Sequence, residues 1–162
     1  DADSHNQNWL TDISYIQTKQ GPFFLSIIRD LFDLSIVAYK TSTRQSIKLV
    51  LDTVRLALKK EEVTAELQLH SDQGFQYASQ SYFALTTQYG ITPSMSRRAN
   101  PYDNAMAENF FSILKFECIR LYKPETILQA QTLIDSYIAF YNHERIQLNS
   151  KLSPIEKRRL FA

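Results

Sequence analysis

The hydrophobic period of this chain changes near residue 43 from that of strands to that of a helix, and this change limits the folds that the chain can adopt. Before it, three segments rich in β-branched and aromatic residues cover 9–18, 23–30 and 34–41, with Gly21-Pro22 as a turn signal. Such segments are typical of strands. Three of them within about forty residues predict an antiparallel meander.

The rest of the chain alternates helices with short strands. Apolar residues recur with a helical period over 43–60, after the capping candidates Thr41, Ser42 and Thr43. Beyond it we expect strands over 65–70 and 91–96, and helices over 79–90, 100–119, 125–145 and 154–161. The pattern predicts one mixed α/β domain.

Composition excludes several classes of protein. With 162 residues, 44% hydrophobic and 22% charged, the chain has the size and balance of an ordinary globular domain. No apolar run approaches the ~20 residues of a membrane span, and residues 1–8 lack the pattern of a secretory signal. We expect 1–8 to be a disordered or vector-derived segment. The lone Cys118 excludes an internal disulfide or a multi-cysteine zinc site and fits a reduced, cytoplasmic protein.

Charge is nearly balanced but uneven along the chain. The net charge of +1 divides into −2 over 1–96 and +3 over 97–162. This basic bias is too small to indicate nucleic-acid binding by itself.

Three carboxylates stand out by position. Asp12 interrupts a predicted strand, where Asp is disfavoured; Asp72 follows another strand just before Gly74; and Glu108 lies on the predicted helix over 100–119. Each also has an ordinary interpretation: a strand brace, a turn residue or an exposed helical acid. Two further acids compete with Asp12 for the first position, Asp30 and Asp33, and are expected to be loop acids.

Glu108 shares a narrow polar stripe with Asn104, Ser112 and Lys115, while the apolar side chains of the same helix point elsewhere. Clusters of carboxylate oxygens suit hard cations such as Mg²⁺. Two such ions can clamp the attacking and leaving oxygens of a phosphodiester displacement.

Five short motifs are distributed along nearly the whole chain from Trp9. They are "W--DISYI" at 9–16, "HSDQG-QY-S--Y" at 70–82, "GITPSMSR" at 90–97, "NPYDNA-AENFF--LK-E" at 100–117 and "YN-ERIQ" at 141–147, with Ser153-Pro154 after them. Thirty-five residues separate Asp72 from Glu108. With this spacing, the chain resembles the catalytic core of DDE transposases of bacterial insertion sequences, in the retroviral-integrase superfamily, where a second reading frame encodes the core.

The resemblance implies an RNase H-like fold with a mixed five-stranded sheet flanked by helices. The core would cover 9–162, with 124–162 as its C-terminal helical part. The sequence departs from the family at Asp33-Leu34, where Ser-Arg is usual, and at Ala38-Tyr39, where Gly-Trp is usual. These departures leave the three acids intact.

The resemblance also implies an activity. Asp12, Asp72 and Glu108 would be the catalytic triad and would bind Mg²⁺ or Mn²⁺, two ions in all, for DNA cleavage and strand transfer. The partners would be transposon-end and target DNA and further copies of the chain, near the bacterial nucleoid and away from membranes. The family's N-terminal DNA-binding region is expected to be missing from this sequence.

DNA contacts are expected around the acids. The candidates are Gln73, Tyr77, Arg97, Arg98, Asn100, Asn104, Lys115 and Arg145. Arg145, with Tyr141 and Asn142, has the alternative of tying the last helices to the core. The basic segment 156–159 is expected to be a solvated helical face or a phosphate contact, and His70 a hydrogen-bonding neighbour of Asp72.

Two rival functions stay open. One is an RNase H-type nuclease that hydrolyses nucleic acid without strand transfer. The other is a catalytically silent, domesticated core that acts as a DNA-binding or interaction module.

Overall fold

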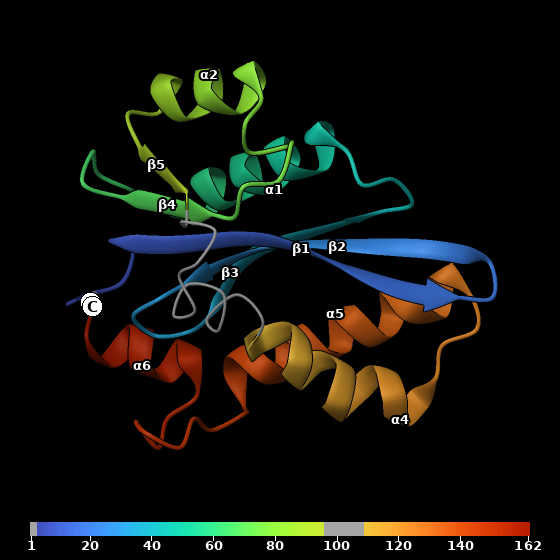
Figure 1. Cartoon of the computed structure of the whole chain (residues 1–162). Helices are drawn as coiled ribbons and strands as arrows, with labels where there is room; N and C mark the ends of the chain where they lie inside the picture. Colours follow the sequence, from blue (N-terminus) through green and yellow to red (C-terminus); the bar gives the residue numbers. More distant parts are fainter. Residues whose placement is uncertain (1–2, 96–108) are drawn as a thin grey trace.

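A twisted sheet lies at the centre of the molecule (Figure 1). The computed structural model describes residues 3–95 and 109–162. Strands β1 (Asn8–Thr18), β2 (Gly21–Asp30) and β3 (Ile36–Ser42) pair in sequence as the predicted antiparallel meander.

Two short parallel strands complete the sheet. Strand β4 (Gln68–Ser71) pairs with β1, and β5 (Thr92–Met95) pairs with β4. The strand order is β3-β2-β1-β4-β5, so the first strand of the sequence is the central strand of the sheet. The mixed five-stranded sheet that the sequence predicted is confirmed.

Helices cover both faces of the sheet. Helices α1 (Ile47–Lys60) and α2 (Gln80–Gln88) lie above it in Figure 1. Below it lie a helical stretch over 109–114, the π-helical turn η1 (Lys115–Ile119), α4 (Arg120–Tyr122), α5 (Ile127–His143) and α6 (Pro154–Leu160). The π-helical turn was not predicted, because helical periodicity alone does not distinguish it from the α-helix around it.

Helix α1 begins later than the sequence suggested. Its N-cap is Ser46, whose hydroxyl accepts a hydrogen bond from the amide of Leu49 at 3.2 Å. Of the predicted caps, Thr41 and Ser42 belong to β3, which continues further than expected. Helices α5 and α6 have Thr126 and Ser153 as their N-caps, each in a capping box that satisfies two backbone amides at the start of the helix.

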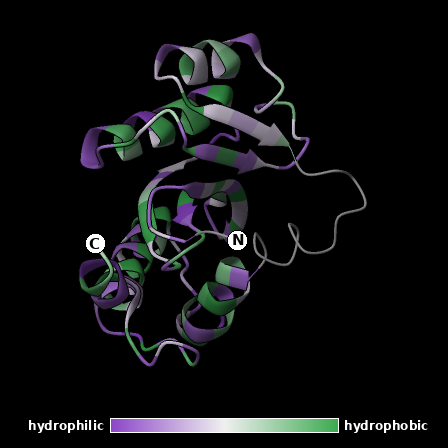
Figure 2. Ribbon diagram, turned by 90° about the vertical axis from the view of Figure 1, so that its left-hand side faces the viewer, coloured by the Kyte–Doolittle hydropathy of each residue, from purple (hydrophilic) through white to green (hydrophobic). Residues whose placement is uncertain are grey.

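Two hydrophobic clusters sandwich the sheet. On the side of α5, Leu25 and Ile27 pack with Phe110 and Tyr141, and Cys118 is buried among them. On the side of α1 and α2, a second cluster includes Trp9, Val50, Val54, Leu69, Tyr77 and Tyr82. Figure 2 shows hydrophobic residues along both helical layers and the sheet between them. The sheet is therefore covered by apolar contacts on both faces.

The described part of the N-terminal segment is bonded to the sheet. The amide of Asn6 donates to Asp30 Oδ2 at 2.7 Å, and the amide of Gln68 donates to the carbonyl of Gln7 at 2.9 Å. Residues 6–8 thus lead directly into the central strand. Among residues 3–95 and 109–162, no helix has the length and apolar content of a membrane span.

Candidate active site

The parallel pairing of β1 and β4 brings two of the predicted acids to neighbouring positions. The strands pair through Trp9 with Leu69 and Leu10 with His70. Asp12 lies two residues further along β1, and Asp72 lies two residues beyond His70, directly after the end of β4. Because side chains two residues apart point to the same face and adjacent strands lie ~4.8 Å apart, the two carboxylates extend from adjacent backbone positions.

Asp72 is held by the turn that ends β4. Its Oδ1 accepts a hydrogen bond from the amide of Gly74 at 2.7 Å, and its carbonyl accepts one from the Ser71 hydroxyl at 2.9 Å. The side chain is exposed. The turn interpretation and the site interpretation of Asp72 are therefore compatible, since the turn fixes the carboxylate at the end of the strand.

Asp12 is half-buried at the centre of the sheet. Its Oδ1 accepts a hydrogen bond from the amide of Ile13 at 2.9 Å, and across the strand pair it lies opposite Ile27 of β2. A carboxylate in mid-strand disfavours the strand locally, so its neighbours in the hydrophobic clusters must offset that cost.

Two residues near the acids in the fold, Tyr77 and Thr11, have buried hydroxyl groups. Tyr77 is 2% exposed and Thr11 is fully buried. Burial raises the pKa of Tyr77 well above its usual value; the charges of Asp12 and Asp72 raise it further, while the neighbouring Thr11 hydroxyl opposes the shift. Tyr77 was predicted as a DNA contact, but its ring lies inside the domain. Gln73 is exposed beside Asp72, and sequence reasoning missed Thr11.

Several predicted site residues fall outside the described ranges. They are Glu108, Arg97, Arg98, Asn100 and Asn104. The helix predicted to carry Glu108 is described from residue 109, where Phe110 and Leu114 form its buried side as expected. Lys115 is half-buried at the first position of η1.

A buried arginine holds the start of this described helix. Arg29 is fully buried; its Nη2 donates to Asn109 Oδ1 at 3.0 Å and to the Tyr141 hydroxyl at 2.8 Å. The Tyr141 hydroxyl donates in turn to the carbonyl of Leu34 at 2.7 Å. The sequence signal for Arg29 is a single cation within the apolar run of β2, and its burial could not be predicted from that run alone.

The C-terminal motif ties α5 to the core. Asn142 accepts a hydrogen bond from the Ile36 amide at 2.8 Å and donates to its carbonyl at 3.0 Å. Arg145 binds both oxygens of Glu117, with Nη2 2.7 Å from Oε2, and Tyr137 donates to Glu117 Oε1 at 2.6 Å. Hydrogen bonds from Arg145 are the main cause of the lowered pKa of Glu117. The structural alternative for these residues therefore has direct support.

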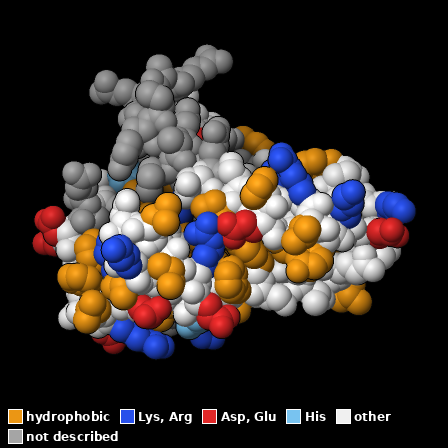
Figure 3. Space-filling view, turned by 90° about the horizontal axis from the view of Figure 1, so that it is seen from below, with side chains coloured by type: hydrophobic (Ala, Val, Ile, Leu, Met, Phe, Trp, Pro, Cys, Tyr) orange, Lys and Arg blue, Asp and Glu red, His pale blue; other side chains and the backbone are white. Residues whose placement is uncertain are grey.

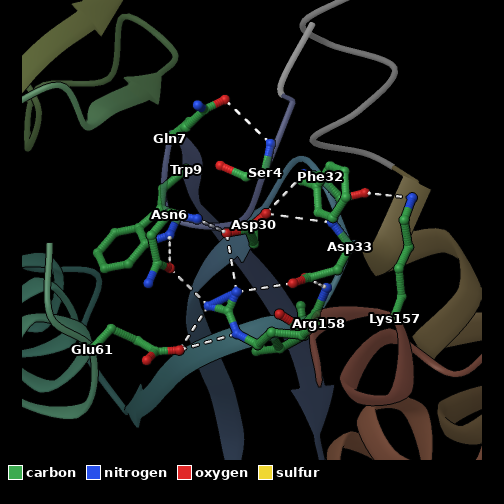
Figure 4. Close-up of polar contacts among 12 residues, drawn as sticks. Ser4, Asn6, Gln7, Trp9, Asp30, Phe32, Asp33, Glu61, Lys157 and Arg158 are labelled. Carbon is green, nitrogen blue, oxygen red and sulfur yellow. Dashed lines mark hydrogen bonds and ion pairs between the residues drawn. The ribbon is translucent and has the colours of Figure 1, made fainter. Parts of the chain in front are cut away.

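The basic segment 156–159 differs from the expected solvated face, because Arg158 is turned into the protein (Figure 4). Its side chain is only 11% exposed and forms ion pairs with Asp33 at 2.9 Å, Asp30 at 3.3 Å and Glu61 at 2.7 Å. Of the two expected loop acids, Asp33 does lie in the turn after β2, whereas Asp30 is the last residue of β2, and both side chains are fully buried. Their burial is possible because Arg158 supplies the compensating charge.

The exposed surface below the sheet carries mixed charges. Figure 3 shows Lys and Arg side chains intermingled with Asp and Glu over the lower helices, with hydrophobic side chains between them. This agrees with the near-neutral net charge of the chain.

The donor set suits a hard divalent cation. Asp12 and Asp72 offer only carboxylate oxygens, and His70 is engaged elsewhere, with Nε2 2.9 Å from Asn8 Oδ1. The described ranges contain no group of three His, Cys, Asp or Glu residues arranged to hold a metal ion, and the predicted third ligand, Glu108, is outside them. Two adjacent carboxylates fit part of a Mg²⁺ or Mn²⁺ site.

Sequence comparisons identify relatives along nearly the whole chain. Two integrase core domain models match residues 2–101 and 108–159. The transposase for insertion element IS904 of Lactococcus lactis is 42% identical over 90% of this chain, and the putative transposase InsK for IS150 of Escherichia coli is 37% identical over 94%. The chain spans 58% and 54% of these relatives, and 73% of a transposase-like protein of Haemophilus influenzae that is 38% identical.

Solved structures agree on the fold. The HTLV-2 integrase catalytic core domain in complex with magnesium superimposes with a TM-score of 0.79 at 16% identity and covers 96% of this chain and 98% of its own. A simian T-cell lymphotropic virus intasome chain gives a TM-score of 0.83 at 18% identity over 94% of this chain and 54% of its own. The RNase H-like fold is thereby confirmed, and the chain belongs to the integrase core domain family, among the DDE transposases of insertion sequences.

Proposed function

We propose that this core catalyses metal-dependent DNA cleavage and strand transfer, with Asp12, Asp72 and Glu108 as its catalytic and metal-binding acids. The observation that supports this best is the parallel β1–β4 pairing, with Asp12 and Asp72 two residues beyond its last pair. The transposase relatives and the thirty-five-residue spacing to Glu108 support the same assignment.

The described residues would orient the acids before DNA arrives. The Ile13 amide holds one oxygen of Asp12, and the Gly74 amide holds one oxygen of Asp72. Divalent ions, when bound, supply Lewis-acid activation of the attacking oxygen and stabilisation of the leaving oxygen. Without them, neighbouring carboxylates repel each other.

The reaction is an in-line displacement at phosphorus. A water molecule, or a DNA 3′-hydroxyl in strand transfer, forms the new P–O bond and gives up its proton. The scissile P–O bond breaks, and the departing 3′-oxygen takes a proton. No covalent bond between protein and DNA is needed, so the acids act by holding metal and substrate in place.

DNA recognition involves more than the acids. We propose that Gln73, Lys115 and, outside the described ranges, Arg97, Arg98, Asn100 and Asn104 contact the DNA backbone or bases near the acids. Because the chain spans about half of its first relatives, strand transfer at transposon ends would need the rest of a full-length protein and several copies assembled on DNA.

The decisive experiment compares wild type with Asp72→Asn and with Glu62→Gln, which changes an exposed acid in the loop before β4. We expect Mn²⁺- or Mg²⁺-dependent nicking of plasmid DNA, and a melting temperature raised by millimolar metal, in wild type and Glu62→Gln only. Metal binding to the native state raises its stability by RT ln(1 + [L]/Kd).

Other outcomes would favour the rivals. In a full-length protein that carries this core, nicking that never joins a supplied 3′-hydroxyl strand to plasmid would indicate an RNase H-type nuclease. DNA binding with equal metal response and equal activity in wild type and Asp72→Asn would indicate a silent binding module and would reject the proposed role of the acid.

A further inference from the structure

One buried side chain in the turn after Asp72 has a donor group that the fold itself leaves unused. Gln76 lies between β4 and α2, within the motif at 70–82, and is 2% exposed. Within the described part of the chain, its Nε2 has no hydrogen-bond partner. A buried N–H group without a partner costs the free energy of its lost hydration. Packing alone therefore gives no reason for a polar residue at this position.

The side-chain amide of Gln76 lies beside the Asp72 carboxylate. A Cβ atom added to Gly74 would be 2.9 Å from Asp72 Oδ1 and also 2.9 Å from Gln76 Oε1. Because both distances of 2.9 Å end at the same point, the two oxygens are at most about 6 Å apart. The amide of Gln76 and the carboxylate of Asp72 are thus close neighbours within one turn.

Backbone hydrogen bonds hold this arrangement on both sides of Gln76. The Gly74 amide donates to Asp72 Oδ1 at 2.7 Å, and the Gly74 carbonyl accepts a hydrogen bond from the Tyr77 amide at 3.0 Å. The Ser79 hydroxyl donates to the carbonyl of Gln76 at 2.8 Å. The turn therefore places the Gln76 amide next to Asp72 before any ligand binds.

The orientation of the amide decides what Gln76 offers to Asp72. With Oε1 turned toward Gly74, two acceptor oxygens approach the same point, and the donor Nε2 is left without a partner among the described residues. The terminal torsion of glutamine is broad and roughly two-fold, so a half turn exchanges Oε1 and Nε2. Nε2 then faces a carboxylate, and hydrogen bonds to an ionised acceptor are about twice as strong as those to a neutral one.

We propose that Gln76 is a positioning residue of the active site, whose Nε2 donates a hydrogen bond to the Asp72 carboxylate and orients it for metal binding. This inference rests on the proposed function of Asp72. Two donors, the Gly74 amide and the Gln76 side chain, then hold this acid. Such outer partners of metal-binding carboxylates commonly change metal affinity 10–100-fold. Since Gln76 is buried, it acts through Asp72 and does not touch DNA.

The chain contains a matched control for this role. Gln147, in the loop between α5 and α6, also has a buried Nε2 without a partner in residues 3–95 and 109–162. Its backbone amide donates to the carbonyl of Leu152 at 2.9 Å. In Figure 1 this loop lies at the bottom, well away from the turn between β4 and α2. Gln147 thus shares the unpaired amide of Gln76 and lacks its proximity to Asp72.

The experiment titrates Mn²⁺ into wild type, Gln76→Met, Gln76→Leu, Gln147→Met and Asp72→Asn. Bound Mn²⁺ is followed by the loss of the electron paramagnetic resonance signal of the free ion, together with the melting temperature and plasmid nicking. Met and Leu both remove the amide of Gln76 but differ in shape, so a loss that both variants share reports on the amide.

In both Gln76 variants, we expect the Mn²⁺ concentration for half-saturation to rise about tenfold or more. Nicking at saturating Mn²⁺ should return to near the wild-type rate, because the metal-binding acids themselves are intact. The metal-free melting temperature should change by only a few degrees, since a single hydrogen bond is lost. Gln147→Met should titrate like wild type.

Three outcomes would reject the role of Gln76 and leave the proposed function in place. The first is that Asp72→Asn weakens Mn²⁺ binding while both Gln76 variants bind like wild type. The second is that Gln147→Met weakens binding as much as the Gln76 variants do, which would make the effect a general one. The third is that both Gln76 variants are unfolded without metal, or that only one of them binds Mn²⁺ weakly, which would make Gln76 a packing residue.

A different outcome separates the two proposals. If wild type and Asp72→Asn bind Mn²⁺ alike, the proposed function of Asp72 fails, and the positioning role of Gln76 fails with it.

Discussion

Arg158, in the last helix, lies 2.9 Å from the carboxylate of Asp33 in the turn after β2. Asp33 stands where the family usually has Ser, and the following Leu34 stands where it usually has Arg. In this chain the carboxylate of Asp33 forms an ion pair with Arg158. The carbonyl of Leu34 accepts a hydrogen bond from the Tyr141 hydroxyl, and Leu34 has a φ of 67°. The side chain of Asp33 is therefore accommodated by an ion pair with α6, whereas the contact at Leu34 involves only its backbone.

Replacing Arg158 should strongly destabilise the domain. In Arg158→Met, the buried carboxylates of Asp30 and Asp33 lose their compensating cation, and we expect the free energy of unfolding to fall by about 3–5 kcal/mol. Urea denaturation at pH 7 measures this. Arg159→Met is the matched control, because Arg159 is exposed on the same helix, and it should change stability by less than about 0.5 kcal/mol. Equal losses in the two variants would contradict the assigned role of the Arg158 ion pairs.

The pH dependence of stability should show the burial of Asp30. Burial raises the pKa of Asp30 and the charge of Asp33 raises it further, against opposing hydrogen bonds from Asn6 and Phe32 and the charge of Arg158. Between that raised pKa and the usual value of about 4, the native state binds more protons than the unfolded state. The contribution of Asp30 therefore becomes more favourable as the pH falls through this window.

Asp30→Asn removes this contribution, so the variant should lose stability more steeply than wild type when the pH is lowered from 7 to about 4. Melting curves across this pH range compare the stability of wild type with that of Asp30→Asn, and Glu62→Gln serves as the control variant. Parallel curves for wild type and Asp30→Asn would mean that the pKa of Asp30 is not raised in the folded protein.

The two interpretations of Arg145, as a structural contact or as a DNA contact, predict different effects of its replacement. Its hydrogen bonds lower the pKa of Glu117, so the pair contributes stability above the usual glutamate pKa and loses it as the pH falls through the lowered value. We expect Arg145→Gln to cost about 1–2 kcal/mol at pH 7, with the difference from wild type shrinking in acid. Arg120→Gln, at an exposed position, is the control.

If Arg145 instead serves chiefly as a phosphate contact, Arg145→Gln would keep its stability. The salt dependence of DNA binding would then fall by about one unit of slope.

Gly74→Ala should weaken metal binding and leave the stability of the fold nearly unchanged. The added Cβ would come within 2.9 Å of Asp72 Oδ1 and of Gln76 Oε1, both ends of side chains that can rotate away. Stability should therefore change by about 1 kcal/mol or less, while Mn²⁺ binding weakens because Asp72 loses its orientation.

Gly90→Ala should behave in the opposite way. Gly90 has a φ of 67° and nothing within 4 Å of an added Cβ, so Ala there is strained and lowers the melting temperature without changing the metal titration. A Gly74→Ala protein with unchanged Mn²⁺ affinity would contradict the orienting role of this turn.

The parts of the structure that could be predicted from the sequence depend on short-range patterns. Alternating apolar residues and the Gly21-Pro22 turn were enough for the meander of β1, β2 and β3, and the Asx-type turn at Asp72 was visible in its own residues. The start of α1 was misplaced because Ser46 and the threonines before it are all acceptable caps, and only the extent of β3 distinguishes them.

What sequence reasoning missed depends on contacts between distant residues. Arg158 and Asp33 are separated by 125 positions, and Arg29 and Tyr141 by 112. Neither pair leaves a local signature, since a basic residue on a short helix normally faces solvent. The burial of the Tyr77 hydroxyl was hidden for the same reason, because its neighbour Thr11 lies in β1, far away in the sequence.

The central place of β1 has a consequence for how the domain folds. The meander can pair within residues 8–42 alone, but the other edge of β1 stays open until β4, sixty residues further along the chain, adds in parallel. Closing so long a loop costs more chain entropy than forming a hairpin. Asp12 and Asp72 therefore come together only once this longer loop closes, and we expect a partly synthesised chain that ends before β4 to hold the meander without bringing the two acids together.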